Sequence, residues 1–121
     1  MTTSQNKARG TRYENECVRY LQERGFKVER NRNQTGATPN RYDIIGLEGW
    51  AVECKDNAGL PDGAAMDAAV RKADQGVPVL IRKRRNHGVE KSLVILEFHD
   101  FVTHVLRKTA EKPAHACAKP S

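Results

Sequence analysis

The chain of 121 residues has few of the features that mark secreted, membrane or zinc-binding proteins. Its three cysteines are odd in number and follow no metal-ligand spacing, which indicates reduced thiols and not a disulfide framework. No apolar run approaches the roughly 18 residues that a membrane helix needs. The polar start, MTTSQNKARG, lacks the apolar core of a secretory signal. We therefore expect a cytoplasmic protein that does not associate with a membrane.

Acidic residues are scarce relative to basic ones. There are 15 Asp and Glu against 21 Lys and Arg, which gives a net charge of +6 and a pI near 9.5. Such a balance favours a polyanionic partner, with nucleic acid first and an acidic membrane surface second.

The densest positive charge is the run Arg82-Lys83-Arg84-Arg85, which follows a predicted buried strand. Lys and Arg supply most of the sequence-independent affinity for DNA through phosphate contacts. Three more arginines, Arg30, Arg32 and Arg41, flank or lie within a polar loop at residues 31–41. We expect all seven residues to contact DNA, although solvated loop and turn charges would give the same pattern.

The hydrophobic pattern predicts one domain with a mixed sheet flanked by helices. Helices are expected from Thr11 to about Arg24, from about Asp62 to Gln75, and from Phe98 to Leu106. The predicted strands are residues 26–30, a hairpin within residues 41–55, residues 77–81 and residues 92–97. The order is αβββαββα, an α/β fold. Residues 1–9 are expected to form a flexible basic arm, residues 10–108 the folded domain and residues 109–121 a disordered tail.

The most informative stretch is RYDIIGLEGWAVECK, residues 41–55. If residues 47–49 form a three-residue hairpin loop that ends on its glycine, Asp43 lies opposite Glu53. Opposed residues point to the same face of a sheet. Glu53 and Lys55 also share a face, because side chains along a strand alternate with a period of two. The pattern predicts that Asp43, Glu53 and Lys55 converge on one place.

Two adjacent carboxylates repel each other, so at neutral pH they take up a proton or bind a cation. Hard oxygen ligands of this kind suit Mg²⁺ or Mn²⁺. A lysine on the same face can sit beside a metal-bound water and stabilise developing negative charge. A surface hairpin with ordinary charges is the alternative interpretation.

Glu14 is the other carboxylate with an unusual position. In the first predicted helix it falls between Val18 and Leu21, within the apolar stripe, whereas Glu16 points toward solvent. A carboxylate there is costly unless it is paired or bound to a metal. Glu14 could be the capping-box partner of Thr11, or it could reach the hairpin as a third acidic group.

The arrangement Asp43 … Glu53-Cys54-Lys55 resembles the core motif of PD-(D/E)xK nucleases, with Tyr42 in place of the proline. The stretch GTRYENECVRYL, with Gly10 four residues before Glu14, is similar to the start of archaeal-type Holliday junction resolvases and of resolvase-like phage nucleases. The resemblance covers roughly residues 7 to 83. It implies a restriction-endonuclease-like core and assigns no role to a residue of the second helix.

The resemblance also implies roles for individual residues. Asp43 and Glu53 would bind the Mg²⁺ or Mn²⁺, with the backbone carbonyl of Cys54 as a further ligand and Glu14 acting directly or through water. Lys55 would position the attacking water or stabilise the charge that develops on the phosphate. The catalytic residues would then be Glu14, Asp43, Glu53 and Lys55.

The implied activity is phosphodiester hydrolysis at four-way DNA junctions by a homodimer, in a prokaryotic or phage-infected cytosol. The sequence leaves three alternatives open. They are a restriction- or repair-type nuclease that acts on other DNA, a non-catalytic DNA-binding module, and an interaction protein with a structural acidic cluster.

Overall fold

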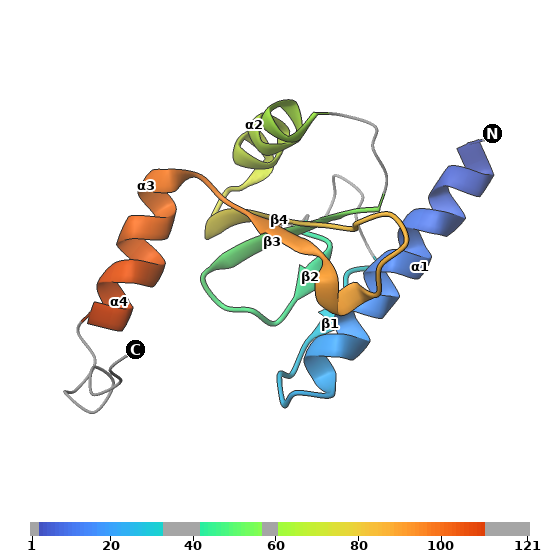
Figure 1. Ribbon diagram of the computed structural model, residues 1–121, viewed down its shortest axis with the longest axis horizontal. Helices are drawn as coiled ribbons and strands as arrows, with labels where there is room; N and C mark the ends of the chain where they lie inside the picture. Colours follow the sequence, from blue (N-terminus) through green and yellow to red (C-terminus); the bar gives the residue numbers. More distant parts are fainter. Residues whose placement is uncertain (1–2, 33–41, 57–60, 111–121) are drawn as a thin grey trace.

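Within the residues that this computed structural model describes, 3–32, 42–56 and 61–110, five strands form one mixed sheet with a helix on each face (Figure 1). The elements are α1 (Thr3–Gln22), β1 (Glu29–Arg30), β2 (Ile44–Ile45), β3 (Trp50–Lys55), α2 (Asp62–Lys72), β4 (Val77–Arg82), the 3-10 turn η1 (Val89–Lys91), β5 (Leu93–Ile95), and the final helical segments α3 (Phe98–Phe101), η2 (Val102–Leu106) and α4 (Arg107–Ala110). This order confirms the predicted α/β fold and is compatible with a restriction-endonuclease-like core.

The strands lie in chain order, β1-β2-β3-β4-β5. Only β3 and β4 are parallel, because α2 carries the chain back across the sheet between them. The β2–β3 hairpin has the predicted register, with Ile44 opposite Val52. Gly49 ends its loop in the left-handed region (φ 88°), as expected.

A second glycine in this hairpin, Gly46, lies against the backbone of the chain that leads into β1. Gly46 has φ 115°, and a Cβ atom there would collide with the backbone carbonyl oxygen of Lys27. Only glycine therefore fits between β2 and the chain that leads into β1.

The main core lies between α1 and the sheet. Tyr13, Cys17 and Val18 of α1 pack with the inward side chains Val52 and Cys54 of β3. Cys17 and Cys54 are free thiols, as predicted.

The opposite face of the sheet is covered by α2. Ala65, Met66 and Ala69 are buried there against Leu80 of β4. The small alanine side chains let the helix approach the sheet closely. Because side chains alternate along β3, Glu53 points to this second face, away from its neighbours Val52 and Cys54.

The first helix begins earlier than predicted. It starts at Thr3, so residues 3–9, predicted as a flexible arm, are helical and the expected cap at Thr11 is wrong. These residues carry no apolar stripe, so hydrophobic periodicity could not detect them, although helix-forming side chains such as Lys7, Ala8 and Arg9 are common there.

The C-terminal segments α3, η2 and α4 form one continuous helix with a π-helical middle. The periodicity favoured burial of this helix within the domain, but Phe98 is 78% exposed and Leu106 is 46% exposed. On the neighbouring strand β5, Val94 is 64% exposed. Thr109 and Ala110, predicted to belong to the disordered tail, are helical residues of α4, and residues 111–121 lie outside the described residues. No described helix is long and apolar enough to cross a membrane.

Candidate active site

Asp43, just before β2, and Glu53, in the middle of β3, lie close together. They are almost fully buried, at 5% and 7% exposure. The Asp43 backbone N–H donates to the Val52 carbonyl (2.9 Å), and its Oδ2 accepts a hydrogen bond from the Cys54 backbone N–H (2.8 Å). The Asp43 carboxylate is thus tied to β3 at the residue that follows Glu53.

Tyr42, which stands where the nuclease motif has proline, anchors the chain just before Asp43. Its hydroxyl donates to the backbone carbonyl of Gln75 and accepts from the backbone N–H of the same residue (2.9 Å). Gln75 follows α2, so Tyr42 connects the segment that bears Asp43, just before β2, to the chain that follows that helix.

Lys72 is a site residue that the sequence reasoning missed. Its Nζ lies 3.1 Å from Oε1 of Glu53, in an ion pair that connects α2 to β3. A signal was present: Lys72 follows Ala65 by seven residues and Ala69 by three, so it continues the buried stripe of α2. A lysine in such a stripe needs an acidic partner.

The two oxygens of Glu53 have different surroundings. Oε1 accepts from Lys72, whereas Oε2 is buried and has no hydrogen-bond partner among the described residues. Burial and the charge of Asp43 raise the pKa of Glu53 to about 7, and the charges of Lys72 and Lys55 oppose this rise without cancelling it. Glu53 therefore exchanges a proton or accepts a cation near neutral pH.

Glu14 lies in the middle of α1, which excludes a role as the capping residue. Its Oε1 is 3.5 Å from an Nη atom of Arg30, a half-buried residue that was predicted to contact DNA. Burial, followed by the charge of Asp43, raises the pKa of Glu14 to about 7, with Arg30 acting in the opposite direction. Asp43 therefore acts electrostatically on both glutamates.

Lys55 ends β3 and is half-buried, with Arg82 of β4 as its neighbour in the sheet. Its charge lowers the pKa of Glu53, which places it near that carboxylate. The ion pair to Glu53, however, comes from Lys72.

The donor set fits a hard divalent cation at Asp43 and Glu53 better than at all three acids. A buried carboxylate oxygen without a partner, beside a second buried carboxylate, is a site that a cation would complete. Glu14, Asp43 and Glu53 do not bring three ligand atoms within 4.8 Å of one another. In the described part of the chain only Glu97, His99 and Asp100, at the start of α3, do so. They were not predicted as ligands.

The residues predicted to contact DNA are dispersed. Arg32 is exposed after β1, and Arg41 lies outside the described residues. Arg82 is held by Asp62 of α2 (3.3 Å). Lys83 is half-buried, and Arg84 and Arg85 are exposed in the turn that follows β4.

A comparison with protein families connects this geometry to a known group. Residues 5–61, just under half of the chain, match the family model of archaeal Holliday junction resolvases (Hjc). No curated protein matches the chain. The matched stretch contains all but the first two residues of α1, the β2–β3 hairpin and the positions Glu14, Asp43, Glu53 and Lys55. The comparison confirms the resemblance stated from the sequence: over residues 5–61 the chain is similar to archaeal Holliday junction resolvases.

Proposed function

We propose that this protein is a metal-dependent DNA endonuclease that cleaves four-way junctions. The observation that carries the proposal is the buried pair Asp43 and Glu53, which lies on the hairpin that matches the resolvase family. Oε2 of Glu53 has no hydrogen-bond partner among the described residues. A structural ion pair would need only one of these acids. The second one leaves an excess of buried negative charge, which favours a cation.

Asp43, Glu53 and the backbone carbonyl of Cys54 would hold Mg²⁺ or Mn²⁺. When bound, the ion would activate water and polarise the scissile phosphate. Lys55 would hold the attacking water or stabilise the charge that develops on the phosphate. Lys72 would keep one oxygen of Glu53 oriented. Glu14, positioned by Arg30, would contribute through water, since it is not within ligand distance of both other acids.

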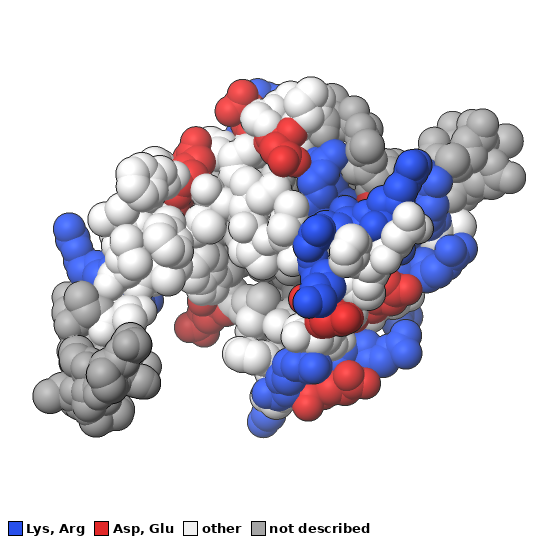
Figure 2. Space-filling model, in the orientation of Figure 1, with Lys and Arg blue, Asp and Glu red and all other residues white. Residues whose placement is uncertain are grey.

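We also propose a homodimer, because two symmetric cuts across a junction require two active sites. The support is an apolar surface formed by Leu93, Val94 and Phe98 on β5 and α3, which are 47%, 64% and 78% exposed. Figure 2 shows a broad uncharged area over these elements. A strand at the edge of a sheet and an apolar helix end are features that a second copy would cover.

The test is cleavage of a labelled four-way junction and of a linear duplex, with Mg²⁺ or with EDTA. Paired nicks in the junction alone, only with Mg²⁺, are the expected result. Glu53→Gln and Lys55→Ala should abolish cleavage while junction binding persists. Glu16→Gln, on the same helix as Glu14, is the matched control and should cut normally.

Other outcomes correspond to the alternative functions. Metal-dependent cutting of both substrates would indicate a restriction- or repair-type nuclease. Binding without any cleavage would indicate a non-catalytic DNA-binding module. Near wild-type cleavage by Glu53→Gln would refute the assignment of the site.

A further inference from the structure

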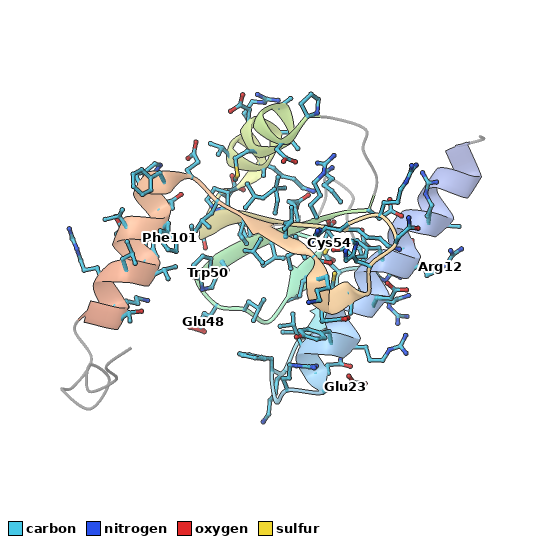
Figure 3. All side chains as sticks on the ribbon, viewed as in Figure 1. Arg12, Glu23, Glu48, Trp50, Cys54 and Phe101 are labelled. Atoms are coloured by element: carbon cyan, nitrogen blue, oxygen red, sulfur yellow. The ribbon has the colours of Figure 1, made fainter. Side chains whose placement is uncertain are left out.

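A second polar feature lies beyond the end of β3, where the first half of α1 meets the turn that follows β4. It is a cleft of about 390 Å³. Five cations and one carboxylate line it: Arg9, Arg12, Arg82, Lys83, Arg85 and Asp56. Figure 2 shows basic side chains gathered over this part of the molecule, and Figure 3 labels Arg12 on α1.

Two distant segments build the cleft. Arg9 and Arg12 are three residues apart on α1, so they lie on the same side of the helix. Lys83 follows the last residue of β4, and Arg85 lies in a turn where Asn86 takes a left-handed conformation (φ 62°). The start of α1 and the end of β4 thus bring their positive charges together.

Among the described residues, ion pairs to acidic side chains neutralise only part of the positive charge of this cleft. Asp56 lies 3.5 Å from Arg9, and Asp62 lies 3.3 Å from Arg82. In the described segments Arg12, Lys83 and Arg85 make no ion pair. Three cations around one concave site favour an anion as ligand.

The cleft is joined to the candidate active site through the backbone. Lys55 and Arg82 are neighbours in the parallel β3–β4 ladder, and the Lys83 N–H donates to the Lys55 carbonyl (2.9 Å). From Glu53 to Asp56 the chain advances three residues, which is about 10 Å at about 3.3 Å per residue. Phosphates along one DNA strand rise about 3.4 Å each along the duplex axis, so the cleft lies within about three nucleotides of the candidate active site.

We propose that this cleft binds one backbone phosphate of the DNA strand that is cut, within about three nucleotides of the scissile bond and on one side of it only. The inference rests on the proposed nuclease function and extends it to the register of the strand in the site. It assigns a role to Arg9 and Arg12, which the sequence did not single out. It also separates Arg85, which lines the cleft, from its neighbour Arg84, which does not.

The first test compares these two neighbours. Binding of a fluorescent four-way junction is measured in EDTA at several salt concentrations for the wild type, for the double variant Arg12→Ala/Arg85→Ala and for Arg84→Ala. The double variant should bind about tenfold more weakly at low salt, and the slope of log affinity against log salt should fall by about one. Arg84→Ala, which removes an exposed charge outside the cleft, should change both quantities far less.

The second test locates the phosphate. Junctions that carry one neutral methylphosphonate, placed in turn at each of four positions on either side of the cut, are bound in EDTA by the wild type and by the double variant. The wild type should lose affinity at one of the first three positions on one side only, and the double variant should show no further loss there.

The proposal would be overturned if Arg84→Ala weakened binding as much as the double variant does. It would also be overturned if at no position the methylphosphonate and the double substitution removed the same contribution to affinity. Binding in EDTA requires no cleavage, so the comparison of the double variant with Arg84→Ala passes or fails even for a protein that never cuts DNA. Conversely, a protein that cuts junctions in the presence of Mg²⁺ but shows no such coupling refutes the cleft alone. Arg12, Arg84 and Arg85 are all exposed, and circular dichroism checks that the variants fold.

Discussion

Replacing Glu53 with Gln should change how the stability of the metal-free protein depends on pH. Burial and the charge of Asp43 raise the pKa of Glu53 to about 7 from an ordinary value of 4.5. At about 1.4 kcal/mol for each pH unit, the charged carboxylate destabilises the fold by about 3 kcal/mol above pH 7. Glu53→Gln removes that charge and keeps the size of the side chain.

The direction of the effect follows from the two pKa values. Below pH 4.5 Glu53 is protonated in both the folded and the unfolded state. Between pH 4.5 and 7 the unfolded chain releases this proton more readily, so the free energy of unfolding falls as pH rises. Above pH 7 the loss is complete. Glu14, whose pKa is also raised to about 7, adds a decline in the same window to both proteins, so the informative quantity is the difference between them.

The assay is urea denaturation in EDTA at pH 5, 6, 7 and 8, followed by the fluorescence of Trp50, the one tryptophan of the chain. The stability of Glu53→Gln relative to the wild type should increase by about 2–3 kcal/mol between pH 5 and pH 8, since a small part of the effect is already present at pH 5. At pH 8, Mg²⁺ at about 100 times its dissociation constant should then raise wild-type stability by about 2.7 kcal/mol and leave the variant nearly unchanged. A pH-independent difference between the two proteins would refute the assignment of Glu53 as a strained buried acid.

Three further outcomes are expected. Lys72→Met should destabilise the protein by up to about 3 kcal/mol at pH 8 and by much less at pH 5, because Glu53 needs the lysine as a partner only when it is charged. Urea titrations at the two pH values measure this difference, and equal losses of stability would contradict it. Gly46→Ala should lower the free energy of unfolding by more than about 1 kcal/mol. Gly63→Ala lies in the first turn of α2 with no atom near the added Cβ, so it should raise the free energy of unfolding by about 0.5–1 kcal/mol. The same titrations compare the two variants, and an unchanged stability of Gly46→Ala would contradict the prediction. Val94→Lys should halve the mass of the proposed dimer in light scattering, and an unchanged dimer would remove β5 from its interface.

The hairpin could be predicted from the sequence because its information is local. A three-residue loop that ends on Gly49 sets the register, and the period of two then assigns each side chain to a face. The position of Asp43 relative to Glu53 follows from those two rules. The order of helices and strands was predictable for the same reason, since each apolar pattern reports on its own segment.

Features that depend on the packing of distant segments were not predictable in this way. Lys72 meets Glu53 only after α2 has crossed over to the second face of the sheet, and no local pattern gives that pairing. Arg12 and Arg85 come together from opposite ends of the domain. The periodicity of the C-terminal helix indicated which side is apolar, but it could not indicate that Phe98 would remain uncovered.

Tyr42 restricts how the segment that carries Asp43 can move relative to the chain that follows α2. A proline in its place would stiffen the chain locally and leave it unconnected to α2. The tyrosine hydroxyl instead forms hydrogen bonds with both the backbone carbonyl and the backbone N–H of Gln75. A displacement that separated Tyr42 from Gln75 would have to break both of these bonds at once. The segment that begins with Tyr42 is therefore held to the chain that follows α2 by two hydrogen bonds from one side chain, at the position where the nuclease motif has proline.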